Sequence, residues 1–195
     1  MSILYSEARV PTALGVFRLR VYDDPREAGP IAIIGGERTS AEPPFVRLHT
    51  SCFVAENLGS LDCDCRERLD VALERISGRG GIVVYLRRDS CGRGLADQIR
   101  NEEYRFVNHG CLDRASFETA ATVLRDLGAV SIRLLTDDPG EAEALGEQGI
   151  EVVGVLPLES LLLSDAASVM SASLEPSSED LAGVHGLDTV SGQTA

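Results

Sequence analysis

The chain of 195 residues contains no lysine, so all 18 of its basic residues are arginine. Against them stand 31 aspartates and glutamates, which give a formal net charge of −13. Because such a charge repels polyanions at long range, it excludes non-specific binding to nucleic acid or to an anionic membrane. Any phosphate or carboxylate that the protein binds must be held by arginine side chains or by backbone amides.

The sequence also lacks long apolar runs and an export signal. No stretch approaches the roughly 20 apolar residues that a membrane helix needs. The N-terminus has no basic region followed by an apolar run. The five cysteines are an odd number, which argues against a disulfide framework. We therefore expect a cytoplasmic protein whose thiols stay reduced.

Apolar periodicity predicts the fold class. Strands are expected within 10–22, after a turn, and at 31–34, 45–49, 82–86, 132–135 and 150–155. Helices are expected at 65–76, 117–127 and from about 139 to 145. This order predicts an α/β (α+β) domain with a mixed β-sheet flanked by helices. We place the domain at residues 1–163, and we expect 164–195, which has few large apolar residues, to be a disordered tail.

Three cysteines lie within fourteen residues: Cys52, Cys63 and Cys65. Three thiolates can occupy three corners of a zinc tetrahedron. Structural zinc usually has four protein ligands, whereas catalytic zinc has three and a water. The alternative is a set of buried thiols that act as small hydrophobic residues. We predict one zinc ion per chain, bound by these three side chains.

Ordered motifs over roughly residues 8–158 resemble the GTP cyclohydrolase II family, zinc enzymes that open the imidazole ring of GTP at the head of riboflavin synthesis. They include Val10-Pro11-Thr12, Val46-Arg47-Leu48-His49, Gly59-Ser60-Leu61, Cys63-Asp64-Cys65, Tyr85-Leu86-Arg87 and Ile132-Arg133-Leu134-Leu135-Thr136. The resemblance implies the same fold and, from residues matching the three cysteines, the same zinc site.

The resemblance also implies a mechanism. In the family, a zinc-bound water adds to C8 of the purine, which leaves as formate, and an arginine attacks the α-phosphorus, so that diphosphate leaves. Arg47, His49 and Thr136 match nucleotide contacts. Magnesium is implied if the substrate is a triphosphate. The expected partner is a small purine-like or nucleotide substrate, and the expected assembly is a homodimer.

Several positions depart from the family pattern. Ser51 stands where the family has a glutamate beside the first zinc cysteine, and Arg68 replaces a glutamine. Asp89 and Cys91 replace a glutamate and an arginine that reaches phosphate. Tyr104 lies two places beyond the position of a family tyrosine.

Further departures concern phosphate. Asp113 aligns with the family's acid, but Ala115 aligns with the nucleophilic arginine, so Arg114 could replace it only after a one-residue shift. On a helix that shift rotates the side chain by about 100°. Glu141 puts an acid where the family has a base that grips the nucleotide.

The candidate catalytic residues are Asp113, Arg114, Asp89 and Cys91. Asp113 could instead be a helix N-cap, and Asp89 a turn residue. Cys91 could be a turn residue, a fourth zinc ligand or a nucleophile. Arg68 could belong to a solvated helix face. The candidate substrate-binding residues are Arg47, His49, Ser51, Arg68, Arg88, Arg93, Tyr104 and Thr136.

The preserved cysteines and the altered phosphate positions predict a zinc-dependent hydrolase of a purine-like nitrogen heterocycle carrying less phosphate than GTP, in specialised metabolism. Two alternatives remain open. One is an authentic GTP cyclohydrolase II with compensating arginines. The other is a non-catalytic nucleotide-binding paralogue that keeps zinc for folding.

Overall fold

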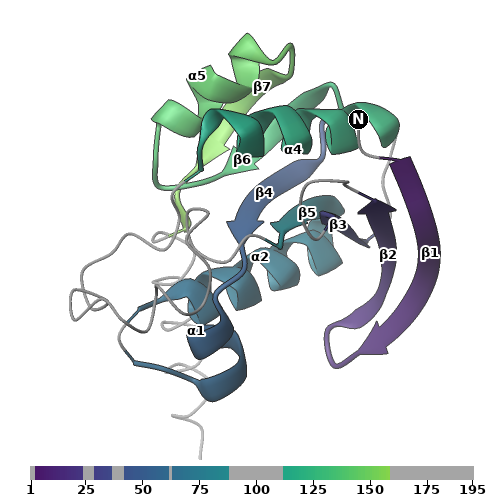
Figure 1. Ribbon diagram of the computed structural model, residues 1–195, viewed down its shortest axis with the longest axis vertical. Helices are drawn as coiled ribbons and strands as arrows, with labels where there is room; N and C mark the ends of the chain where they lie inside the picture. Colours follow the sequence, from purple (N-terminus) through teal and green to yellow (C-terminus); the bar gives the residue numbers. More distant parts are fainter. Residues whose placement is uncertain (1–2, 24–28, 37–41, 62, 88–111, 159–195) are drawn as a thin grey trace, which may run out of the picture. The chain divides into compact units, whose positions relative to one another are not determined.

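The computed structural model describes residues 3–23, 29–36, 42–61, 63–87 and 112–158 (Figure 1). The described strands are β1 (Ile3–Thr12), β2 (Gly15–Asp23), β3 (Ile31–Gly35), β4 (Phe45–Thr50), β5 (Gly81–Leu86), β6 (Ser131–Leu135) and β7 (Glu151–Leu156). The described helices are α1 (Phe53–Leu58), α2 (Cys65–Arg79), α4 (Arg114–Asp126) and α5 (Gly140–Glu147).

The strands form one mixed sheet in the order β1-β2-β3-β5-β4-β6-β7. The pairs from β1 through β3 to β5 are antiparallel, whereas β5, β4, β6 and β7 pair in parallel. The predicted mixed sheet and α+β class are thereby confirmed. Because parallel strands end on the same side, the carboxyl ends of β4, β5, β6 and β7 meet at one edge of the sheet.

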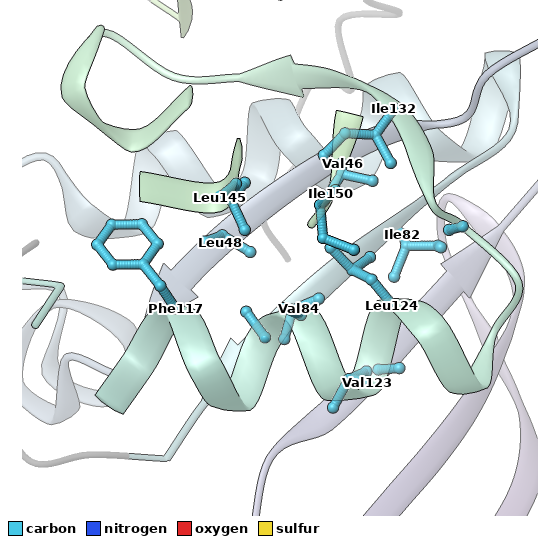
Figure 2. Packing of buried hydrophobic residues seen from close by; sticks show 14 of the residues in the cluster. Val46, Leu48, Ile82, Val84, Phe117, Val123, Leu124, Ile132, Leu145 and Ile150 are labelled. Carbon is cyan, nitrogen blue, oxygen red and sulfur yellow. The ribbon is translucent and has the colours of Figure 1, made fainter. Parts of the chain in front are cut away.

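Helices cover both faces of this sheet. On one face, Val46 and Leu48 of β4 belong to the core that includes α4 residues such as Phe117 and Leu124 (Figure 2). On the other face, Phe45 belongs to the core built around α2. Every residue of β4 is buried, as expected for a central strand covered on both sides.

Two described elements were not predicted. β1 forms an antiparallel hairpin with β2, and its residues 6–9 are exposed, so no apolar alternation marks it. Thr12 Oγ1 stabilises the hairpin turn by accepting a hydrogen bond from Leu14 N at 3.2 Å. The helix α1 has six residues, which is too few for a helical period to be read from its sequence.

The predicted tail at 164–195 lies outside the described residues. Within the described ranges, no helix combines the length and the apolar character needed to cross a bilayer.

Two glycines of the α2–β5 unit have opposite surroundings and yield a stability prediction. A Cβ on Gly81 would collide with the Phe45 carbonyl oxygen and lie 2.7 Å from Ile76 Cγ2, whereas a Cβ on Gly78, within α2, would meet nothing within 4 Å. We expect Gly81→Ala to lower the free energy of unfolding by about 2 kcal/mol through overpacking. Gly78→Ala should raise it by up to about 1 kcal/mol, because alanine favours helix. Urea unfolding measures both, and shifts of the same sign would contradict the packing described.

Candidate functional site

The candidate site lies at the edge where the parallel strands end. Cys52 follows β4, and Thr136 follows β6. The hydrogen bond from Ser51 N to Leu86 O, at 2.9 Å, carries the β4–β5 ladder up to the residue before Cys52. Ligands of open α/β sheets usually bind at the carboxyl ends of the strands. Ser51, a predicted substrate contact, is therefore placed at this edge and half-buried.

Three thiols converge there. Cys52 is the N-cap residue of α1, Cys65 is the first residue of α2, and Cys63 lies between the two helices. Their sulfur atoms all lie within 4.8 Å of one another, and Cys52 Sγ is 3.8 Å from Cys63 Sγ. With Zn–S bonds of about 2.3 Å, the edge of a tetrahedron of sulfurs is about 3.8 Å. The group has the donor atoms and the spacing to hold a metal ion.

Two of the thiols, those of Cys63 and Cys65, have pKa values raised above the ordinary thiol value. A hydrogen bond with Cys52, together with burial, raises the pKa of the Cys65 thiol. Burial raises the pKa of the Cys63 thiol as well, and the nearby Cys52 adds to the increase. Thiolates so close together repel one another, so a positive ion among them would stabilise all three.

A carboxylate that the sequence analysis missed organises the same corner. Glu56 of α1 accepts hydrogen bonds from Cys52 N at 2.7 Å, from His49 Nε2 at 3.1 Å and from Tyr85 Oη at 2.5 Å. Burial alone would raise the pKa of Glu56, but these three hydrogen bonds outweigh it and lower the pKa below its ordinary value. Glu56 is therefore held as a carboxylate.

His49 is directed into this network. Its side chain is 4% exposed, and its ring stacks on Tyr85 with 5.5 Å between the ring centroids. The structure thus places His49, a predicted substrate contact, beside Glu56.

Arg47 is buried on the same strand. Its Nη1 donates to Leu135 O at 3.1 Å and lies 3.8 Å from Glu141 Oε2. Its Nε has no hydrogen-bond partner in the part of the chain that the structure describes. Burial lowers the pKa of Arg47 and raises that of Glu141. Glu141 is 8% exposed at its side chain, so it faces Arg47 within the protein.

Arg68 is also paired with carboxylates. From the first turn of α2 it donates to Asp64 Oδ2 at 2.7 Å and to Asp137 Oδ2 at 2.6 Å. Asp137 follows β6, so Arg68 joins α2 to the loop after that strand. Thr136 in this loop is buried, and its Oγ1 accepts a hydrogen bond from Asp138 N at 3.0 Å.

The two described candidates for catalysis lie at the start of α4. Asp113 is its N-cap, and Asp113 Oδ1 accepts hydrogen bonds from Ser116 N at 2.8 Å and from Ser116 Oγ at 2.7 Å. Arg114 is 84% exposed at its side chain and pairs with Glu118 at 3.1 Å. The other candidates lie outside the described residues: Arg88, Asp89, Cys91, Arg93 and Tyr104.

The missed residues left weak signals in the sequence. Glu56 lies four residues after Cys52, between the first and second cysteines of the cluster, and Tyr85 is the one polar side chain in the apolar run 82–86. Asp137 gives no local sign of its pairing, because its partner Arg68 is 69 residues away.

The two arginine clusters generate a stability prediction. Glu141→Gln leaves the buried Arg47 charge uncompensated, so we expect the free energy of unfolding at pH 7 to fall by about 3 kcal/mol. Asp137→Asn removes one carboxylate partner of the partly exposed Arg68 and should cost less than about 1 kcal/mol. Denaturant titration of both variants measures the difference. Equal losses would show that the Arg47–Glu141 pair is more solvated than described.

Comparison with known proteins places the chain in a family. The family model described as GTP cyclohydrolase II matches residues 4–157. GTP cyclohydrolase-2 of Histophilus somni is 31% identical over 169 residues, which cover 80% of this chain and 77% of that protein. Riboflavin biosynthesis protein RibBA of Nocardia farcinica is 30% identical over 207 residues. That match covers 97% of this chain but about half, 49%, of RibBA.

A solved structure of RibBX, a two-domain 3,4-dihydroxy-2-butanone 4-phosphate synthase from A. baumannii, aligns with a TM-score of 0.47 and 19% identity. The alignment covers 80% of this chain and 39% of that one. The match of the family model over residues 4–157, together with the 31% identity to a GTP cyclohydrolase-2, shows that the chain is a divergent member of the GTP cyclohydrolase II family.

Proposed function

We propose that this protein is a zinc-dependent hydrolase of the GTP cyclohydrolase II type that opens a purine-like nitrogen heterocycle carrying less phosphate than GTP. The observation that carries the proposal is the convergence of Cys52, Cys63 and Cys65 beyond the end of β4 in a chain of this family. A place in specialised metabolism, a cytoplasmic location and a homodimeric assembly belong to the same proposal.

The donor set fits zinc. The three thiols would hold one ion, since sulfur ligands suit Zn²⁺ and the spacing of 3.8 Å agrees with tetrahedral coordination. When bound, zinc with three protein ligands supplies a Lewis acid that makes a water molecule nucleophilic near neutral pH. The Glu56 network joins α1, β4 and β5 at the thiols, which favours a fixed substrate orientation.

The charges around the thiols support a substrate with little phosphate. Arg68 is paired with Asp64 and Asp137, and Arg47 lies beside Glu141. A triphosphate that used either guanidinium would compete with the carboxylate beside it, and unit charges about 4 Å apart interact by roughly 4 kcal/mol at an effective dielectric of 20. An uncharged or singly phosphorylated substrate avoids that loss.

Other residues complete the proposal from the sequence. Asp113 is proposed as the general acid or base, with its N-cap bonds holding the carboxylate in place. Arg114, Asp89 and Cys91 remain catalytic candidates, and Arg88, Arg93 and Tyr104 remain substrate contacts. Magnesium is proposed only for a triphosphate substrate.

The metal site is tested by composition. Cys63→Ser should lower zinc from about one ion per chain to a small fraction, because serine is a poor zinc ligand. Cys111→Ser is the control. Cys111 is not one of the predicted zinc ligands, so this variant should keep its zinc. Metal analysis by plasma mass spectrometry after dialysis measures both. Wild-type protein without zinc would contradict the proposed function.

The substrate class is tested by a phosphate series. Purified zinc-loaded protein is incubated with guanine, guanosine, GMP and GTP, with formate, ammonia and diphosphate measured separately. We expect formate from an uncharged or monophosphorylated member, with kcat/KM at least tenfold above that for GTP. Cys63→Ser serves as the inactive control.

Two results would contradict this proposal in different ways. Conversion of GTP to formate and diphosphate at an ordinary enzymic rate would identify an authentic GTP cyclohydrolase II. Tight binding of a nucleotide with no product from any member of the series would identify a non-catalytic nucleotide-binding protein.

A further inference from the structure

We propose that Glu56 is the positioning residue of the thiol group, holding the backbone of Cys52 and the ring of His49 in one fixed arrangement. The inference rests on the metal site of the proposed function. It assigns a role to a carboxylate that provides none of the three sulfur ligands.

The first support is convergence. Donors from three separate elements meet on this one carboxylate: Cys52 N at the start of α1, His49 Nε2 on β4 and Tyr85 Oη on β5. The Glu56 side chain is 12% exposed, so little water competes for its oxygens. A buried carboxylate with three good donors holds its neighbours far more tightly than an exposed one.

The second support is the way in which α1 begins. Cys52 is the N-cap residue with φ −128° and ψ 94°, and it makes no side-chain cap. A serine or aspartate at this position would accept a hydrogen bond from the first turn. The Cys52 sulfur instead faces Cys63 at 3.8 Å, and Glu56 secures the start of the helix by accepting from the Cys52 backbone N–H. The Cys52 sulfur therefore takes no part in capping and lies among the other two sulfurs of the thiol group.

The third support is the division of donors between the two oxygens. Oε1 accepts from Cys52 N and from His49 Nε2, whereas Oε2 accepts from Tyr85 Oη. A carboxylate has no proton to give, so His49 carries a proton on Nε2 and, when neutral, keeps its lone pair on Nδ1. Glu56 is hydrogen-bonded to a proposed metal ligand through the backbone N–H of Cys52. Residues that hydrogen-bond a metal ligand usually fix its orientation, and their loss costs about 10–100-fold in metal affinity.

The test compares three substitutions that separate shape from charge. Glu56→Gln keeps the length, and its amide oxygen can accept from Cys52 N and His49 Nε2 while its NH₂ donates to the Tyr85 hydroxyl. Glu56→Asp keeps the charge but is one methylene too short to reach all three donors. Glu56→Ala removes the acceptors. Glu118→Ala, which changes a surface glutamate of α4 paired with Arg114, is the matched control.

The first measurement is zinc affinity of the folded proteins, by competition with a chromogenic chelator. We expect Glu56→Gln and Glu118→Ala to stay within about threefold of wild type, whereas Glu56→Asp and Glu56→Ala weaken binding by about 10–100-fold. If circular dichroism shows that Glu56→Ala does not fold, the comparison of the other two variants decides the question: zinc affinity should be higher for Glu56→Gln than for Glu56→Asp. An effect of charge alone would give the reverse order.

The second measurement uses the metal-free protein, so it does not depend on activity or on zinc. Long-range ¹H–¹⁵N spectra should show a slowly exchanging Nε2–H on His49 in wild type and in Glu56→Gln, and its loss in Glu56→Ala or Glu56→Asp. A purely structural role of Glu56 in stability would not order the variants in this way.

The failures are distinguishable. If the Glu56→Asp and Glu56→Ala variants bind zinc as tightly as wild type and keep the His49 signal, the role of Glu56 is overturned and the proposed function still stands. A wild-type protein that binds no zinc would overturn both.

Discussion

The parallel register between β4 and β5 is the constraint on which the rest of the site depends. It pairs His49 with Tyr85 and Thr50 with Leu86, so the two polar rings stack and both reach Glu56 beyond the strand ends. A slip of one residue would turn every side chain of β4 to the opposite face. Arg47 and His49 would then lie in the apolar core under α4, and Val46 and Leu48 would face the polar corner. The burial of β4 on both faces excludes that slip, because each face of the sheet has its own apolar cover.

Pairing within the chain sets the charges that the site offers. Arg47 and Arg68 are two described cations of this edge, and each lies beside an acid from another element: Glu141 for one, Asp137 for the other. Glu141, which from the sequence alone would face a substrate, faces Arg47 inside the protein. Its effect on a nucleotide would thus be indirect, through neutralisation of an arginine and not through repulsion. Both side chains are almost fully buried, and this burial shifts the pKa values of both members of the pair toward their neutral forms.

Much of the fold could be predicted because its central elements are regular and apolar. The buried strands at β4, β5 and β6 and the amphipathic helices α2 and α4 carry clear periodicities, and the structure confirms a mixed sheet flanked by helices. The exposed hairpin strand β1 and the six-residue helix α1 could not be found in this way. The cysteine spacing predicted that the three thiols lie together, and the structure confirms this, since the three sulfurs lie within 4.8 Å of one another.

The amino-acid sequence by itself determined the class of the fold, the cysteine cluster and the resemblance that the family match confirms, because those properties depend on local periodicity and on ordered motifs along the chain. Only the tertiary structure decided which polar and charged side chains meet. Glu56 with Tyr85, Arg68 with Asp137 and Arg47 with Glu141 are pairs separated by 29 residues or more, and no local pattern records them. Long-range pairs form where strand register and helix packing bring side chains together, and that geometry belongs to the folded chain as a whole.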